Sequence, residues 1–383
     1  MWFSKLEKEL PLVAFFQQEK LHFSAAGFPL LSGLKNVKMY KLIVLFLFLT
    51  LLSSCSDQED VYVNKPLDFQ VPANFPDLAY NIALNPPTEK GFELGKKLFY
   101  DGRLSSDGLI SCGFCHIQEN AFTHHEHTFS HGVGDNIGTR NTPSIQNLGY
   151  QTAFMYDGAT THLDLQPIIP LTSAIEMNGN LTKIVAMMKA DKTYQKLFQQ
   201  AFTDGAINTE NMLKALSQFM LMVTSSNSKF DKYRRNETGG TFTSEELSGY
   251  TLFNTKCASC HATDLMTDNS YRNNGLAVNP QINDVGRFRV TQLATDYYKF
   301  KVPSLRNVEK TTPYMHDGRF GTLESVLDHY ASGVVNGATL DPILNQNGNL
   351  GIPLSEIQKI QLIAFLKTLT DNQYLTDKRF SDY

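Results

Sequence analysis

The sequence predicts an all-α fold made of two tandem domains, with long ordered loops between the helices. A length of 383 residues suits about two domains, and 42% hydrophobic against 19% charged residues is the balance of a globular protein. A cryptic repeat supports the tandem arrangement. Residues 142–147 (TPSIQN) and 154–158 (FMYDG) recur as VPSLRN and YMHDG, in each case 160 residues later. We therefore expect one domain over residues 85–235 and a second over residues 236–383.

The N-terminus has the pattern of an export signal. Residues 42–52 (LIVLFLFLTLL) form a short apolar run that follows three lysines and precedes Leu-Ser-Ser-Cys55. The run is too short for a transmembrane helix, which needs ~20 apolar residues. Leu-Ser-Ser-Cys resembles a bacterial lipobox, so we predict a lipoprotein signal over residues 39–54 with lipid on Cys55; an ordinary buried cysteine after a signal anchor is the alternative. Residues 1–38 are expected to be an over-extended gene model.

These features predict a lipoprotein of the bacterial periplasm, held at the membrane by the lipid on Cys55. Residues 55–84 are expected to be a tether, because the stretch 56–87 contains five prolines and few apolar runs. The formal charge of −4 gives no support for a nucleic-acid partner.

The four other cysteines form two copies of one motif, Cys-x-x-Cys-His. This pattern is the signature of c-type haem attachment, in which two thiols add to the vinyl groups of one haem and the histidine ligates its iron. The predicted haem-binding thiols are Cys112, Cys115, Cys257 and Cys260, and the predicted iron ligands are His116 and His261. The sequence therefore predicts two covalently bound c-type haems.

Two other interpretations of these cysteines fit less well. A thioredoxin-like redox pair does not need the following histidine, and no βαβ pattern surrounds either motif. A zinc knuckle would bring both cysteine pairs to one metal ion and would leave the two histidines without a role.

Local patterns are helical where they can be interpreted. Thr243 with Glu246 and Ser355 with Gln358 form capping boxes, the pattern of a helix start. The second box opens a helix whose expected inward residues are Ile357, Ile360, Leu362, Ile363, Leu366 and Leu369. A helix is also expected over residues 207–223, with core positions at Met212, Leu213, Leu216, Met220 and Val223. Residues 117–165 lack strand alternation and are expected to be ordered loops around the haem edges.

Together, these motifs resemble the bacterial di-haem cytochrome c peroxidase family, which includes the methylamine-utilisation protein MauG. The resemblance covers roughly residues 85–375, with the motifs in the family's order and at compatible spacings. It implies two cytochrome-c-like helical domains whose haems face the domain interface. In this family the N-terminal haem reacts with peroxide and the C-terminal haem transfers electrons.

The resemblance also implies two catalytic residues. Glu176 lies in Ala-Ile-Glu-Met-Asn, similar to the family's active-site segment, and Gln166 lies ten residues earlier, as the family pattern requires. Splitting a peroxide requires a proton to move from the inner to the outer oxygen. A carboxylate near the iron suits that transfer, and an amide can orient the peroxide. The alternative for Glu176 is a surface helix cap.

Further ligands follow from the same resemblance. His131 matches the removable distal ligand of the peroxidatic haem, although a solvated histidine-rich loop is an alternative, to which we assign the neighbouring histidines at 124, 125 and 127. Asn141, Thr311 and Pro313 fall where the family binds an interdomain calcium ion through oxygen atoms.

The chain departs from the well-known peroxidases at three positions. Tyr156 stands where the family often has a tryptophan between the haems, and Met155 stands where an aromatic residue often flanks the peroxide pocket. Tyr330 occupies the usual position of the distal methionine of the second haem. A phenolate would stabilise higher iron oxidation states, which is the MauG-like arrangement. His329 could be the ligand instead, or Tyr330 could merely pack on the haem.

We therefore expect a cytochrome-c peroxidase type oxidoreductase that reduces hydrogen peroxide to water. Its electrons would come from a small periplasmic donor, a cytochrome c or a cupredoxin, through the C-terminal haem. One alternative is a MauG-like oxidase that acts on a protein or organic substrate through high-valent iron. Another is a non-catalytic di-haem electron carrier, which would need neither Gln166 nor Glu176. The family is often dimeric, so a homodimer is compatible with the sequence.

Overall fold

A computed structural model describes residues 64–382 of the chain. The predicted signal and Cys55 lie outside the described residues. Within the described part, no helix is both long enough and apolar enough to cross a membrane.

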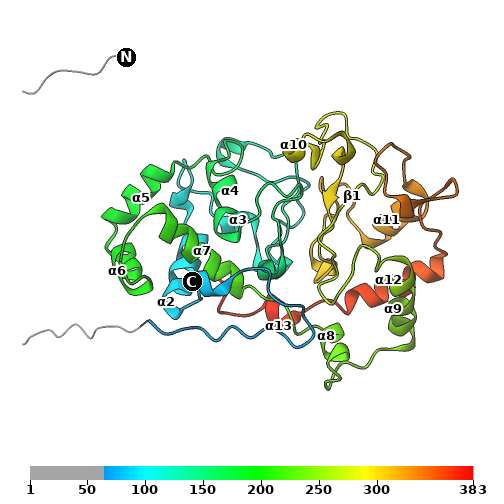
Figure 1. Ribbon diagram of the computed structural model, residues 1–383, viewed down its shortest axis with the longest axis horizontal. Coiled ribbons are helices and arrows are strands. Elements are labelled where there is room, and N and C mark those ends of the chain that lie inside the picture. Colours follow the sequence, from blue (N-terminus) through cyan, green and yellow to red (C-terminus); the bar gives the residue numbers. More distant parts are fainter. Residues whose placement is uncertain (1–63, 383) are drawn as a thin grey trace, which may run out of the picture. The chain divides into compact units, whose positions relative to one another are not determined.

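Helices carry most of the regular structure, as predicted, and they divide between the two halves of the chain (Figure 1). The first half contains α2 (Glu89–Phe99), α3 (Cys112–Cys115), α4 (Ile168–Thr172), α5 (Leu181–Ala190), α6 (Lys192–Ala201), α7 (Thr209–Met222) and α8 (Lys229–Arg234). The second half contains α9 (Ser244–Lys256), α10 (Phe288–Thr291), α11 (Leu323–Asp328), α12 (Glu356–Lys367) and α13 (Asn372–Leu375). The strands among residues 64–382 are short: β1 (Tyr271–Arg272), β2 (Phe300–Lys301), β3 (Asn345–Gln346) and β4 (Asn349–Leu350).

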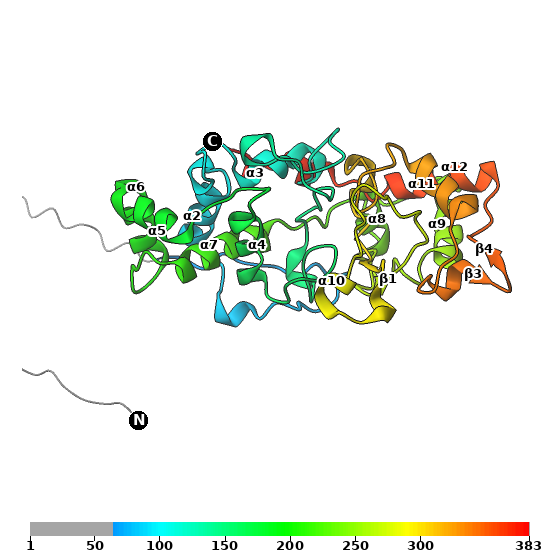
Figure 2. The ribbon, with the colours of Figure 1, turned by 90° about the horizontal axis from the view of Figure 1, so that it is seen from above.

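One long helix pair forms the centre of each half. In the first half α2 packs against α7, and in the second half α9 packs against α12, as Figure 2 also shows. A glycine permits the close approach in both pairs. A Cβ on Gly95 would collide with the carbonyl oxygen of Ala215, and a Cβ on Gly249 would collide with that of Gln361. The two glycines occupy matching positions in the sequence, four residues before Phe99 and Phe253 respectively.

The predicted helix starts are confirmed. The capping boxes of Thr243 with Glu246 and of Ser355 with Gln358 both form. The predicted inward face of α12 is partly wrong, because Ile357 is 69% exposed and Ile360 is 56% exposed. Leu362, Ile363, Leu366 and Leu369 are buried as expected. The neighbouring elements cover only one side of α12, so the apolar residues near its N-terminus on the other side remain in solvent.

The predicted helix over 207–223 corresponds to α7, whose methionines and leucines belong to the core as expected. The long segment before α4 contains only single turns of helix besides α3, which agrees with the predicted ordered loops. The fold is not purely helical, however. Strand β1 pairs antiparallel with β2, and β3 pairs antiparallel with β4.

The cores do not follow the predicted domain limits strictly. Tyr374 and Phe380 pack in the core of the first half, where Gln118 Nε2 donates to the Tyr374 carbonyl at 3.0 Å. Phe230, expected in the first domain, packs in the core of the second half. Each half thus contributes a segment to the core of the other half. In agreement with this exchange, the described residues belong to one compact unit.

Residues 64–84 also differ from the expected tether. Phe75 is buried against Tyr150, with their ring centroids 5.2 Å apart. The side chain of Asn74 donates to Asp231 at 3.0 Å. This part of the chain is therefore packed against the body of the protein.

The two copies of the repeat make reciprocal contacts. The amide of Asn141 donates to the carbonyl of His316 at 2.8 Å, and the amide of Lys301 donates to the carbonyl of Tyr156 at 2.7 Å. Lys301 stands 160 residues after Asn141, and His316 stands 160 residues after Tyr156, so the two hydrogen bonds are related by the repeat. The repeated segments therefore lie where the two halves meet.

A buried polar network reinforces this contact. Gln146 Nε2 donates to the carbonyl of Arg306, the residue at its own position in the second copy, at 2.7 Å. Arg306 and Asp231 form an ion pair in which both side chains are fully buried. Removing one partner of such a pair leaves an uncompensated charge, which is strongly destabilising. The network therefore ties the repeat copies together.

Candidate active site

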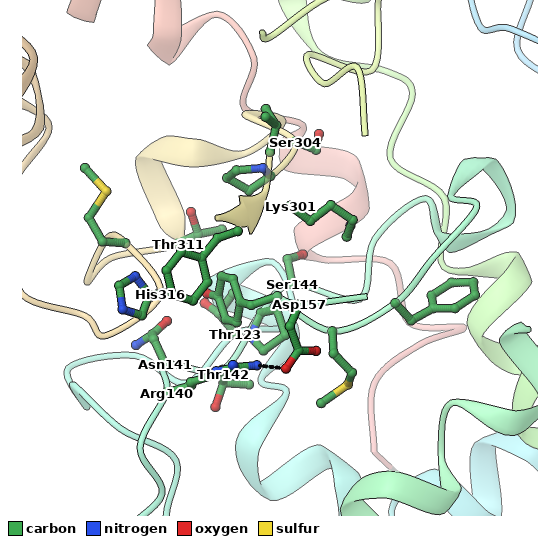
Figure 3. A pocket seen from close by; sticks show the side chains of 18 of the residues that line it. Thr123, Arg140, Asn141, Thr142, Ser144, Asp157, Lys301, Ser304, Thr311 and His316 are labelled. Atoms are coloured by element: carbon green, nitrogen blue, oxygen red, sulfur yellow. Dashed lines mark hydrogen bonds and ion pairs between the residues drawn. The ribbon is translucent and has the colours of Figure 1, made fainter. Parts of the chain in front are cut away.

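One cavity of about 620 Å³ is bordered by both Cys-x-x-Cys-His motifs. This volume lies within the range of roughly 300–1,000 Å³ typical of small-molecule and cofactor sites. Its lining includes Cys112, Cys115, His116, Cys257, Cys260 and His261. Figure 3 shows the side chains of part of this lining.

The local structure of the first motif brings its thiols together. Ser111 Oγ accepts a hydrogen bond from the Phe114 amide at 3.2 Å and starts the single turn α3, which contains Cys112 and Cys115. Burial raises the pKa of Cys112 to about 12 and that of Cys115 to about 11, so both thiols are neutral. All four motif cysteines are free thiols.

Nothing in the described residues supports the zinc interpretation. Within residues 64–382, no three His, Cys, Asp or Glu side chains are grouped so that they could hold a metal ion.

Both motif histidines have the environment of an axial iron ligand. Nδ1 of His116 lies 2.8 Å from the Phe122 carbonyl oxygen, and Nδ1 of His261 lies 3.1 Å from the Met266 carbonyl oxygen. A carbonyl accepts only, so Nδ1 carries the proton and Nε2 is left as the free electron-pair donor. Burial lowers the pKa of both rings, to about 4 for His116. Neutral imidazoles beside paired thiols on one cavity fit two c-type haems.

A serine in each copy of the repeat supports these carbonyls. Ser144 Oγ donates to the Ala121 carbonyl, next to Phe122, and Ser304 Oγ donates to the Leu265 carbonyl, next to Met266; both distances are 2.6 Å. Each serine therefore fixes the loop that orients its motif histidine. Sequence reasoning missed this role, although the repeated Pro-Ser pair was visible.

Ser304→Ala is expected to shift the spectrum and reduction potential of the haem at Cys257–His261 only. The lost hydrogen bond, worth about 1 kcal/mol, would loosen the carbonyl that accepts from His261. Resonance Raman of the iron–histidine stretch and an optical redox titration measure the effect. Ser144→Ala is the matched variant, and it should affect only the other haem. Equal effects of both variants on both haems would contradict this role.

Glu176 and Gln166 both line the cavity that His116 borders. Burial raises the pKa of the Glu176 carboxyl above its ordinary value, and the Ser173 side chain opposes the shift with a hydrogen bond. Gln166 Nε2 points at the Met155 sulfur, 3.7 Å away. The structure thus brings the predicted acid–base residue and the predicted amide to one cavity.

His131 also lines the cavity, but it lies among other histidines. Its Nε2 is 3.0 Å from Nδ1 of His127, whose ring stacks on that of His124 at 4.1 Å. His124 is buried, and burial lowers its pKa to about 4. The expectation of a solvated loop is therefore wrong for His124, whose ring also lies 5.8 Å from that of Phe114 in α3.

Tyr156 and Met155 both line the cavity. Burial raises the pKa of Tyr156 well above its ordinary value, with the Arg140 charge opposing the shift. The Tyr156 carbonyl accepts from the Lys301 amide, so this residue lies where the repeat copies meet.

The side chains of Tyr330 and His329 lie in different surroundings. Tyr330 lines the cavity, and the thiols of Cys260 and Cys257 are close enough to influence its pKa, which burial raises to about 12. His329 is buried, and its Nε2 lies 3.0 Å from the Asn274 carbonyl oxygen. The two residues begin a π-helical turn after α11, so successive side chains leave the axis in different directions.

Asn141, Thr311 and Pro313 all line the cavity. The Asn141 side chain donates to the carbonyl of His127 at 2.9 Å, and Thr311 Oγ1 donates to the carbonyl of Val308 at 3.3 Å. In Figure 3 Asn141 lies near His316 and Arg140. The three residues thus come from both halves of the chain to one cavity.

Comparison with known proteins agrees with this geometry. The profile of the di-haem cytochrome c peroxidase family matches residues 89–239. MauG of Methylorubrum extorquens is 35% identical over 290 residues, covering 74% of this chain and 79% of MauG. The chain belongs to the di-haem cytochrome c peroxidase and MauG family. Cytochrome c551 peroxidase of Nitrosomonas europaea is 34% identical over 301 residues, covering 76% of this chain and 83% of that protein.

Solved structures of the family share the fold. A MauG-like protein associated with microbial copper homeostasis aligns with a TM-score of 0.74 and 33% identity, over 82% of this chain and 99% of that one. The di-haem peroxidase BthA of Burkholderia thailandensis aligns with a TM-score of 0.64 at 21% identity, which indicates the fold alone. Family membership makes this chain a peroxidase-type oxidoreductase with two c-type haems.

Proposed function

We propose that the chain reduces hydrogen peroxide to water at the haem held by the first motif, and that the haem of the second motif delivers the electrons. Each turnover takes two electrons and two protons and yields two water molecules. The observation that carries this proposal is that Glu176 and Gln166 line the cavity that His116 borders, with Glu176 close enough to Cys115 to influence its pKa. Bound haem supplies iron that accepts the peroxide and stores oxidising equivalents.

The residues of the chain would handle the proton and the substrate's orientation. Glu176 takes a proton from the iron-side oxygen of the peroxide and returns it to the outer oxygen, which then leaves as water. Its raised pKa suits both steps, because the carboxyl can exchange a proton nearer to neutral pH. Gln166 orients the outer oxygen through its amide. His131 would occupy the iron in a resting state and leave before peroxide binds.

The MauG-like function is a second candidate, and Tyr330 favours it. Tyr330 borders the cavity near the cysteines of the second motif, where the better-known peroxidases use methionine. A phenolate ligand would stabilise higher iron oxidation states and allow oxidation of a protein or organic substrate. MauG itself is among the relatives, at 35% identity.

The remaining assignments belong to the same proposal. We assign residues 85–235 and 236–383 to two cytochrome-c-like domains with haems facing their interface, apart from the exchanged segments. Tyr156 would carry electrons between the haems, and Asn141, Thr311 and Pro313 would hold a calcium ion between the domains. A lipid on Cys55 would hold the protein to a membrane on the periplasmic side. The electron donor would be a small cytochrome c or cupredoxin, and the protein could pair as a homodimer.

An anaerobic redox titration followed by peroxide addition tests the function. We expect two haems with separate potentials, and rapid reoxidation of the reduced protein by hydrogen peroxide. Turnover should then follow oxidation of a reduced small cytochrome. Peroxide-driven oxidation of aromatic substrates without cytochrome turnover would support the MauG-like function instead. If neither haem reacted with peroxide, a non-catalytic di-haem electron carrier would be the remaining function.

A further inference from the structure

Lys301 is a cation of the cavity to which the proposed mechanism gives no role. It lies in β2, where its amide donates to the Tyr156 carbonyl and its position pairs with Tyr271 of β1. Its side chain lines the cavity that both Cys-x-x-Cys-His motifs border, and Figure 3 shows it on the same side as Ser304. Backbone hydrogen bonds therefore fix Lys301 on the cavity that both predicted haem sites share.

The ammonium group of Lys301 has a neutral partner. Nζ donates to Gln151 Oε1 at 2.6 Å, and within the described residues no carboxylate forms an ion pair with it. Burial is the sole cause that shifts its pKa, which falls to about 8. A half-buried ammonium without a counter-ion is unfavourable, because desolvation disfavours the charged form.

The other cations on the cavity are arranged differently. Arg140 pairs with Asp157 and with Asp284, at 2.7 and 2.6 Å. Arg272 pairs with Asp268 and Asp341.

Two further cations border the cavity. A guanidinium nitrogen of Arg289 lies 3.7 Å from a carboxylate oxygen of Asp284, and the Arg289 side chain is 56% exposed. Lys256 is half-buried, and its Nζ donates to the Pro353 carbonyl at 3.1 Å through a solvent-exposed hydrogen bond. Among the cavity cations, Lys301 thus combines burial that lowers its pKa with the lack of an anionic partner in the described chain.

The cofactors of the family supply suitable anions. Each haem carries propionate carboxylates, and a carboxylate inside a cavity needs a cation or several hydrogen-bond donors. We propose that Lys301 binds a haem propionate and, through its charge, raises the reduction potential of that haem. The sign follows from electrostatics, because a nearby positive charge favours the ferrous form, which carries one positive charge fewer than the ferric form. This role of Lys301 does not depend on whether peroxide or an organic substrate is the natural reactant.

The test is the pair of haem potentials in Lys301→Met, measured by anaerobic optical redox titration of the haem-loaded protein. We expect the midpoint of one haem to fall, and Lys301→Arg to keep it near the wild-type value. Lys299→Met is the matched control. It removes the same charge two residues away, from a side chain that pairs with Asp296 at 3.5 Å and does not line the cavity. A midpoint in Lys301→Met equal to that in Lys299→Met would overturn the proposal.

Lys301→Met could fail to attach haem, and its potentials could then not be measured. The haem content of each variant therefore serves as a second measurement. Loss of haem in Lys301→Met and Lys301→Gln with retention in Lys301→Arg would support the need for a charge, whereas loss in all three would overturn it. A crystal structure of the haem-loaded protein gives an independent readout. We expect Nζ of Lys301 within about 3.2 Å of a propionate oxygen. A propionate bound entirely by other groups would contradict the proposal.

Discussion

Glu176→Gln is expected to lower peroxide turnover by a factor of about 10² to 10⁴, the usual contribution of a positioned acid–base group. An amide has nearly the shape of the carboxyl but cannot take up and return the proton. The measurement is steady-state turnover per haem with a reduced small cytochrome. Haem content should be unchanged, because Glu176 is not part of either attachment motif.

The matched control is Glu210→Gln on α7, where the carboxylate is 72% exposed and pairs with Lys214. It removes the same charge away from the cavity and should leave turnover unchanged. The pH profile adds a second readout. Because burial raises the pKa of Glu176, wild-type activity should fall with decreasing pH at a higher pH than an ordinary glutamate would give, and this limb should disappear in Glu176→Gln. A variant with reduced folding yield but unchanged turnover per haem would make Glu176 structural.

Tyr330→Phe is expected to change the spectrum of the second haem and to raise its potential by on the order of 0.1 V, within the span of about 0.8 V that axial ligands cover. Loss of an anionic oxygen ligand removes the stabilisation of ferric iron. Optical and EPR spectra with a redox titration measure the change. The signals of the haem ligated by His116 should stay the same.

His329→Gln is the control for this variant. Its amide can still donate to the Asn274 carbonyl, which accepts from His329 in the wild type, so the neighbouring turn should persist. We expect the second haem to keep its wild-type spectrum. If Tyr330→Phe left the second-haem spectrum unchanged, Tyr330 would not be a ligand and the MauG-like function would lose its main support.

Motif spacing predicted the parts of the site that depend on covalent chemistry. Cys-x-x-Cys-His places two thiols and a ligand within five residues, so no tertiary information is needed to interpret it. The helix over 207–223 could also be predicted from the sequence, because its apolar residues recur at helical spacing on one side.

Other features depend on contacts that spacing does not encode. Ile357 and Ile360 follow the apolar pattern of α12, yet they are exposed because no element covers them. The 100° between successive helical residues required His329 and Tyr330 to diverge. Only the structure shows which of them faces the cavity, because Tyr330 belongs to its lining and His329 does not.

Lys301 is not part of any motif, and the matching residue in the first copy of the repeat is Asn141. The repeat therefore did not predict a charged residue at this position of the cavity. The packing of Phe75 and of Phe380 into the body likewise depends on partners far along the chain.

The stoichiometry of the reaction tests the central claim most directly. The haem-loaded protein is mixed with hydrogen peroxide and an excess of a reduced small cytochrome, and peroxide consumed, cytochrome oxidised and oxygen released are measured together. We predict two cytochromes oxidised for each peroxide consumed, with no oxygen release, and a loss of this reaction in Glu176→Gln. Peroxide consumption without matching cytochrome oxidation, or with release of oxygen, would contradict the proposal that the two haems form a peroxidase.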